Sequence, residues 1–229
     1  VSNSSVYNIT IISMSLGTSE LYNGYCDGNY AGSPNITQSV NNAILKNISV
    51  IAATGNNNNK TAIASPACIR NVTSVTRSNK DDTPNAGSQS GNNNNLTDLI
   101  APGSDITSTS KNGGSESRSG TSMSTPIIAG AFALLRQFKR LESNKILTPL
   151  EIENTFKSTG RYITESSGLN FSRINIYAAA LSLQNPVVAL ISPTNGVRTN
   201  TSQTNFTCNT STDSNFAFIS NITLFIYNT

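Results

Sequence analysis

The chain has 229 residues, of which 36% are hydrophobic and 12% are charged, and 15 basic residues against 12 acidic ones give a formal charge of +3. This length suits one substantial core with a small appendage. No apolar run approaches the roughly 18 residues that a membrane helix needs, and the basic residues form no cluster interleaved with aromatic ones. We therefore expect neither a membrane span nor a nucleic-acid partner.

Hydrophobic periodicity predicts strands that alternate with helices. In chain order, the sequence predicts a strand ending at Leu16, a helix over 36–46, strands over 48–53 and 72–76, a long helix beginning near Ser122, and helices over 149–158 and 174–183. Thr148 and Pro149 suit the N-cap and the first position of the helix over 149–158. The pattern predicts an α/β fold with a mostly parallel sheet, covered on both faces, whose active site lies at the strand ends.

The hydrophobic pattern of the sequence changes after residue 183. Residues 184–187 are typical of a linker, and residues 188–229 contain β-rich runs, at 187–191, 204–208 and 222–227, without a helical period. This segment resembles the first strands of an immunoglobulin-like sandwich, with Cys208 placed as on its second strand. About three strands are present against the roughly seven of a complete sandwich, so we expect a partial domain.

The segment 119–126, Ser-Gly-Thr-Ser-Met-Ser-Thr-Pro, stands at the start of the longest predicted helix. Gly120 permits a sharp turn, which places Ser122 at the helix N-terminus. There, its own N–H and the helix dipole favour developing negative charge, as a nucleophilic serine requires. The alternative is that Thr121, Ser122 and Ser124 only cap the helix.

Four segments, in the same order and spacing, resemble the subtilisin-like serine proteases. They are the nucleophile segment 119–126 followed by IIAGAFALL, the strand 11–17 ending in Ser-Leu-Gly, the strand 49–56 ending in Ala-Ala-Thr-Gly-Asn, and the Ala-Pro-Gly turn within 99–103. The resemblance implies that residues 1–183 are the C-terminal part of a subtilisin-like three-layer peptidase domain.

The resemblance assigns the catalytic roles. It implies that Ser122 is the acylating nucleophile of a Ser-His-Asp triad and that Asn56 donates from its side chain to the oxyanion. An amide N–H₂ suits this purpose because it does not titrate at any working pH. Without the resemblance, Asn56 is typical of a loop, since it opens the asparagine run 56–59.

The resemblance also implies a site for a polypeptide substrate in extended conformation. Its residues are Ser15, Leu16 and Gly17 on one strand and Ala53, Thr54 and Gly55 on the other, which together form the walls of the primary specificity pocket. Because neither wall carries a charged residue, we expect a roomy pocket that prefers apolar side chains.

The sequence contains no histidine, so the base that Ser122 needs is missing. In this family, the triad occurs in the order Asp, His, Ser, and the histidine precedes the Ser-Leu-Gly strand. We therefore expect the His and the Asp upstream of this fragment, and the 229 residues alone to be inactive.

Two alternatives remain. One is a non-catalytic binding or adhesion protein that kept the fold and lost the base. The other is a sedolisin-like serine-carboxyl peptidase, in which an acid replaces the histidine. The second is disfavoured for two reasons. In sedolisin-like enzymes, the oxyanion residue resembles an aspartate, whereas this chain has Asn56 at that place. In addition, Asp105 and Glu116 lie in polar loops.

The three cysteines give information on the cellular compartment of the protein. Cys26 and Cys68 lie in predicted loops and suit a disulfide in an oxidising environment, with Cys208 left over; buried free thiols are the alternative. Together with the many N-x-Ser/Thr sequons, most of which the composition alone explains, they favour an extracellular or cell-surface protein. We expect no cofactor. The resemblance allows for a propeptide partner and for calcium, although no compact acidic cluster provides a calcium site.

Overall fold

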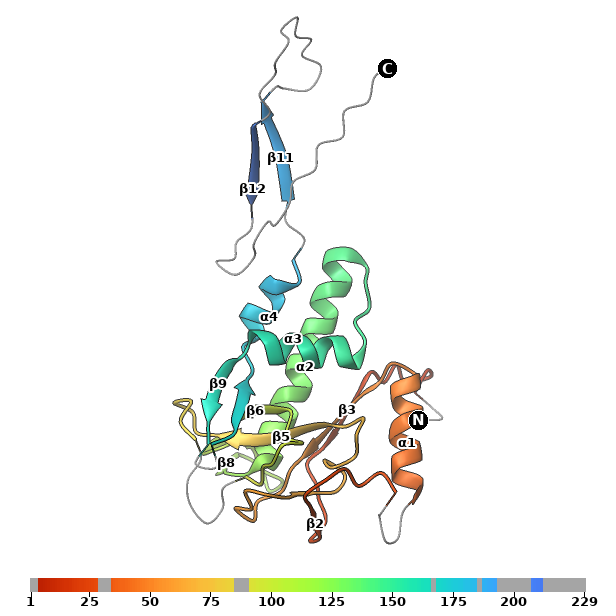
Figure 1. Ribbon diagram of the computed structural model, residues 1–229, viewed down its shortest axis with the longest axis vertical. Helices are drawn as coiled ribbons and strands as arrows, with labels where there is room; N and C mark the ends of the chain where they lie inside the picture. The colour runs from red at the N-terminus through yellow and green to blue at the C-terminus, as the bar shows by residue number, and fades with distance from the viewer. Residues whose placement is uncertain are drawn as a thin grey trace, which may run out of the picture.

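The computed structural model describes residues 4–28, 34–84, 91–165, 168–184, 187–192 and 207–211. Figure 1 shows the central sheet, in which β3, β5, β6 and β9 are labelled. The sheet has six strands in the order β1-β3-β5-β6-β10-β9. In that order, the strands are Ile11–Met14, Ser49–Ala53, Thr73–Ser78, Leu99–Pro102, Asn170–Arg173 and Arg161–Thr164. Neighbouring strands from β1 to β10 pair in parallel, whereas β9 pairs antiparallel with β10. The mostly parallel α/β sheet is confirmed.

Helices cover both faces of this sheet. They are α1 (Pro34–Leu45), α2 (Thr121–Ser143), α3 (Pro149–Thr159) and α4 (Ile176–Ser182). Helix α2 crosses β1, β3, β5 and β6, and α1 packs on β3. Within β3, Ile51 joins the core beside α2, and its neighbours Val50 and Ala52 join the core beside α1. Such two-sided cover explains why β3 and β5 are buried along their whole length.

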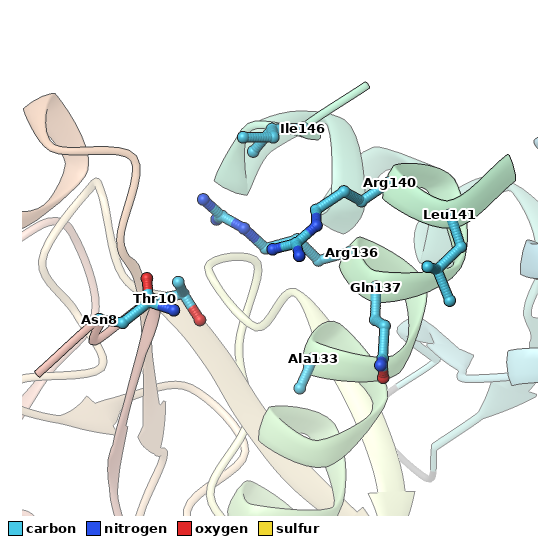
Figure 2. Close-up of a pocket in the computed structure, with 8 residues that line it drawn as sticks. All are labelled: Asn8, Thr10, Ala133, Arg136, Gln137, Arg140, Leu141 and Ile146. Carbon is cyan, nitrogen blue, oxygen red and sulfur yellow. The ribbon is translucent and has the colours of Figure 1, made fainter. Parts of the chain in front are cut away.

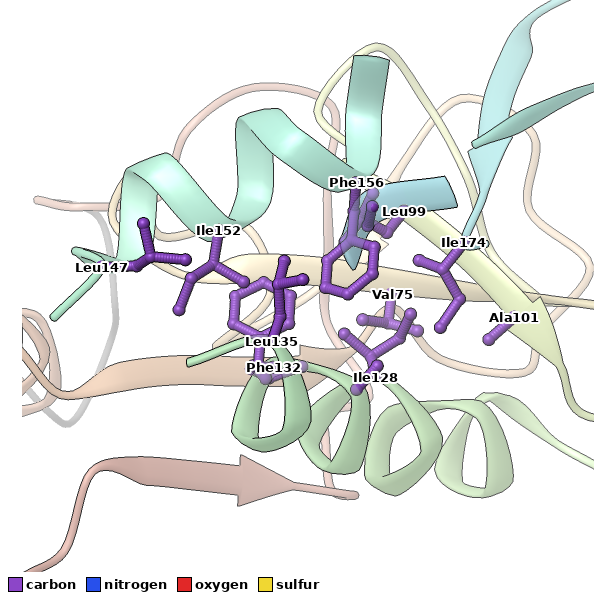
Figure 3. Packing of buried hydrophobic residues seen from close by; sticks show 13 residues of the cluster. Val75, Leu99, Ala101, Ile128, Phe132, Leu135, Leu147, Ile152, Phe156 and Ile174 are labelled. Atoms are coloured by element: carbon purple, nitrogen blue, oxygen red, sulfur yellow. The ribbon is translucent and has the colours of Figure 1, made fainter. Parts of the chain in front are cut away.

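The core beside α2 fixes the long helix to the sheet. Phe132 of α2 and Phe156 of α3 are fully buried and stack with their ring centroids 5.6 Å apart. Figure 3 shows these rings among aliphatic side chains from α2, α3 and the sheet strands β5 and β6. The packing leaves the first turn of α2 at the carboxyl ends of the strands.

The starts of α2 and α3 agree with the sequence-based prediction. Thr148 and Glu151 form a reciprocal capping box at the start of α3, and Pro149 occupies its first position. Helix α2 begins at Thr121 and ends at Ser143, and the C-cap Asn144 adopts a left-handed conformation and donates its N–H to the Arg140 carbonyl.

Several short strands were not predicted. β2 (Leu21–Tyr22) pairs with β4 (Ile63–Ala64), β7 (Ile106–Thr109) pairs with β8 (Ser115–Arg118), and β9 forms a hairpin with β10. The β7–β8 strands consist mainly of exposed polar residues, so they lack the hydrophobic alternation by which strands are recognised.

The C-terminal segment contributes a separate two-stranded antiparallel sheet, β11 (Val187–Ser192) with β12 (Thr207–Ser211). Strand β11 falls on the predicted run at 187–191, and β12 overlaps the end of the run at 204–208. The run at 222–227 lies outside the described residues. The immunoglobulin-like assignment of 188–229 and the linker at 184–187 therefore remain predictions.

A disulfide joins Cys26 to Cys68, the pair named from the sequence, with 5.4 Å between their Cα atoms. Both residues are fully buried in the core beside α1. None of the helices in the described part of the chain combines the length and the apolar character needed to cross a membrane.

Candidate active site

Ser122 is the second residue of α2, and the chain reaches it through Gly120. Gly120 has φ 155°, a conformation that suits glycine, and its carbonyl accepts from the N–H of Met123. A Cβ at Gly120 would lie 3.3 Å from Nδ2 of Asn56. The glycine therefore lets the Asn56 side chain lie directly against the start of the helix.

Asn56 follows β3 and is held by the residue before the serine. Its Oδ1 accepts hydrogen bonds from the Thr121 N–H at 2.8 Å and from the Thr121 hydroxyl at 3.2 Å. Since a backbone N–H can only donate, these contacts fix which end of the carboxamide faces Thr121 and leave Nδ2 as a donor. Asn56 is exposed to solvent. The two predicted catalytic residues thus meet at the N-terminus of α2.

The end of β1 also reaches Ser122. The Ser15 hydroxyl donates to the Ser122 carbonyl at 2.8 Å, and the Ser122 hydroxyl donates to the Ser15 carbonyl at 3.4 Å. The turn at Gly103 closes the base of the site, since its carbonyl accepts from the Gly120 N–H at 2.8 Å. The segments 11–17, 49–56 and 99–103 therefore all contact the nucleophile segment 119–126, as the four motifs of the sequence require.

The two predicted substrate walls differ in exposure. Ser15, Leu16 and Gly17 are exposed, whereas Ala53 and Thr54 are buried. The Thr54 hydroxyl donates to the carbonyl of Asn92 at 2.6 Å and to that of Val75 at 3.2 Å. Its side chain is therefore engaged inside the protein and does not line an open pocket wall.

Ala64 on β4 lies between the two walls. A Cβ at Gly17 would lie 3.0 Å from the Ala64 Cβ, and one at Gly55 would lie 3.5 Å from it. The sequence-based expectation of a roomy pocket did not take the Ala64 methyl group into account. This group narrows the space between Gly17 and Gly55. Nothing in the two-residue strand marks Ala64 in the sequence.

A second residue that the sequence analysis missed is Asn92, which is fully buried. Its Oδ1 accepts from the N–H groups of Asn57 and Asn59, each at 2.9 Å, and its own N–H donates to the Gly55 carbonyl at 2.9 Å. Asn92 therefore holds the turn that carries Asn56. In a chain so rich in asparagine, sequence alone could not distinguish it from its neighbours.

No described residue serves Ser122 as a base. The Ser122 hydroxyl contacts the Ser15 carbonyl, which does not take up a proton at neutral pH. Within the described ranges, neither nearby carboxylate contacts Ser122: Asp105 accepts from Ser119 Oγ at 3.4 Å, and Glu116 binds Arg118 at 2.9 and 3.2 Å. The geometry gives no support to either acid as the base of a sedolisin-like site.

No group of three or more His, Cys, Asp or Glu side chains among the described residues could hold a metal ion.

Known proteins resemble this chain in sequence. An intracellular serine protease of Paenibacillus polymyxa is 36% identical over 148 residues, which are 63% of this chain and 41% of that protein. Thermitase of Thermoactinomyces vulgaris is 36% identical over 155 residues, which are 66% of this chain and 51% of that protein. The chain thus spans about half or less of the length of these relatives.

Solved structures share the fold. The prenylagaramide maturation protease PagA superposes with a TM-score of 0.67 at 24% identity, over 80% of this chain and 66% of that one. A protease from Pseudoalteromonas arctica gives a TM-score of 0.62 at 27% identity, over 76% and 51% of the two chains. The family model described as the subtilase family matches residues 3–203. The chain belongs to the subtilase family of peptidases.

Proposed function

We propose that this chain carries the nucleophile and the oxyanion site of a serine endopeptidase. The observation that supports this most directly is the convergence of Ser122 and Asn56 at the N-terminus of α2, where Thr121 binds Asn56 Oδ1 at 2.8 Å. Backbone N–H groups at a helix N-terminus and the N–H₂ group of an exposed asparagine are suitable donors for an oxyanion.

In the proposed reaction, a polypeptide lies extended along Ser15 to Gly17. Ser122 Oγ attacks the scissile carbonyl carbon while a histidine takes the hydroxyl proton, and Asn56 Nδ2 with the Ser122 N–H binds the resulting oxyanion. The histidine passes the proton to the leaving amine, and water then hydrolyses the acyl-enzyme. The histidine and the aspartate that orients it come from outside these 229 residues, which contain no histidine.

The first experiment tests the nucleophile in the full-length protein. Ser122→Ala should abolish peptide hydrolysis and labelling by a fluorophosphonate. Ser119→Ala, a change in the same segment at a hydroxyl that contacts Asp105, should preserve both. Hydrolysis that survives Ser122→Ala would exclude the proposal. A full-length protein that binds peptides but neither cleaves them nor reacts with the fluorophosphonate would be the non-catalytic binding protein instead.

Asn56→Ala tests the oxyanion site. Its kcat should fall by roughly 10²–10³ with little change in KM, the loss typical of removing one oxyanion-hole donor from subtilisin. The isolated 229-residue chain should be inactive. Turnover by that chain that depends on Ser122 would contradict the assignment of the base to another segment.

We further propose an extracellular or cell-surface location, which the Cys26–Cys68 disulfide supports because disulfides persist in oxidising compartments. The relative from Paenibacillus polymyxa is by name an intracellular enzyme, so location needs its own measurement. Fractionation should recover the oxidised protein outside the cell or at its surface. Recovery of a reduced protein from the cytosol would contradict this location.

A further inference from the structure

A cavity of about 300 Å³ lies at the opposite end of α2 from Ser122. Arg136 lies fourteen positions after Ser122, so a rise of 1.5 Å per residue puts about 21 Å between them along the helix. Asn8 and Thr10, from the segment that enters β1, form the facing wall. This cavity is therefore distinct from the candidate active site.

Two arginines dominate the cavity. Figure 2 shows the side chains of Arg136 and Arg140 extending from α2 into the same space, towards Asn8 and Thr10. Like charges four residues apart on a helix repel each other. Within the described part of the chain, neither guanidinium forms an ion pair, and no carboxylate lines the cavity. The space is therefore strongly electropositive.

The first of these arginines is fixed in place. Its Nη1 donates to the Asn47 carbonyl at 2.7 Å, and burial lowers the pKa of Arg136 from its ordinary value. A guanidinium has five N–H donors, so this single bond leaves others for a ligand. The helix dipole favours a cation in the last turn, which accounts for Arg140, and the bond to Asn47 engages one edge of the Arg136 guanidinium.

This cavity, named here the α2 cleft, has Asn8, Thr10, Arg136, Gln137 and Arg140 as its polar lining and Ala133, Leu141 and Ile146 as its apolar lining. We propose that it binds the dianionic group of a small phosphate monoester. Two guanidiniums match the charge and the multiple oxygen acceptors of such a group. Asn8 and Thr10 on the facing wall supply an amide and a hydroxyl as further donors. A volume of about 300 Å³ leaves room for the organic part, since small-molecule sites begin near that size.

The test is calorimetric titration of the full-length protein in phosphate-free buffer, at constant ionic strength set with chloride. O-phosphoserine should bind more tightly than inorganic phosphate, and serine should not bind. Equal binding of the two phosphates would identify free phosphate as the ligand and overturn the monoester assignment. Absence of binding by either phosphate up to 10 mM (roughly −2.7 kcal/mol) would overturn the site itself.

Variants then locate the binding. Arg140→Gln should weaken O-phosphoserine at least tenfold, and Arg140→Lys should recover part of the affinity because the charge returns without the planar fork. Arg70→Gln is the matched control, since it removes the same charge from an arginine that covers the Tyr25 ring outside the cleft. An equal loss in the control would show non-specific attraction and refute the site. Binding needs no turnover, so the result is independent of the proposed peptidase activity.

Discussion

The Ser15 hydroxyl supplies the Ser122 carbonyl with a hydrogen bond that helix α2 cannot provide. A helical carbonyl normally accepts from the N–H four residues later, and that position is Pro126, which has no N–H. The hydroxyl at 2.8 Å replaces the missing donor. The end of β1 is thereby fastened to the residue that carries the proposed nucleophile.

Ser15→Ala should therefore lower the free energy of unfolding by about 1 kcal/mol, the usual net contribution of one hydrogen bond. In a protein of this size, that corresponds to a fall in Tm of roughly 2–4 °C. Ser15→Thr should retain most of the stability because the hydroxyl remains. Ser13→Ala, at an exposed serine of the same strand, is the control, and a comparable loss there would show that the bond to Ser122 is unimportant.

The methyl group of Ala64 should control which side chain the substrate presents next to the cleaved bond. In the full-length protein, Ala64→Gly should raise kcat/KM for peptides with a large apolar residue at that position, relative to alanine, by about tenfold. Ala64→Val should shift the ratio the other way. Ala67→Gly, at a buried alanine outside the two walls, should leave it unchanged. An unaltered ratio in both Ala64 variants would place the specificity pocket elsewhere.

Glu151 should make stability fall in acid. The ammonium of Lys145 and then the N–H of Thr148 lower the pKa of Glu151 to about 2. An acid whose pKa is lower in the folded state stabilises the fold above its unfolded pKa, near 4.3, and loses this contribution as the pH falls towards 2.

The corresponding variant is Glu151→Gln, compared with the parent by urea unfolding between pH 2 and pH 6. Because the ion pair with Lys145 is largely exposed, we expect a difference of roughly 0.5–1 kcal/mol at pH 6 that shrinks towards pH 2. Lys145→Gln should remove only part of the stability that Glu151 contributes at pH 6, since the capping box remains. A difference that does not vary with pH would rule out the ionised carboxylate as its source.

The disulfide should be a major contributor to stability. Cys26 and Cys68 are 42 residues apart, and a cross-link closing such a loop is worth about 4 kcal/mol in the chain-entropy model. The Cys26→Ala/Cys68→Ala variant should lose roughly 2–4 kcal/mol in urea unfolding. Reducing agent should destabilise the parent but not this variant. Equal urea midpoints for the parent and the variant under oxidising conditions would contradict the prediction.

Periodicity predicted the elements that bury a continuous face. The long helix after Ser122 and the buried strands β3 and β5 were anticipated because apolar residues dominate the surfaces they pack. The β7–β8 hairpin was not, since its residues meet solvent and one another. Short pairings of this kind depend on where tertiary structure brings the chain, which local sequence does not encode.

The candidate site shows the same division. Ser122, Asn56 and the strand at Ser15 were recognisable because each stands in a motif of fixed spacing. Ala64 and Asn92 act through distant partners, and their own neighbours give no sign of it. The sequence placed Thr54 in a substrate wall without indicating where its side chain points, and in the structure its hydroxyl donates to buried carbonyls.

The runs at 56–59 and 92–95 each consist of four asparagines, yet these residues differ in structural role. One carboxamide faces solvent at Asn56, and another is enclosed at Asn92 with two N–H groups directed at its oxygen. Inserting or deleting a single asparagine in either run would barely change the composition, but it would shift every later residue by one place. The number of asparagines in each run therefore matters, because it decides which carboxamide meets Thr121 and which one receives the N–H groups of Asn57 and Asn59.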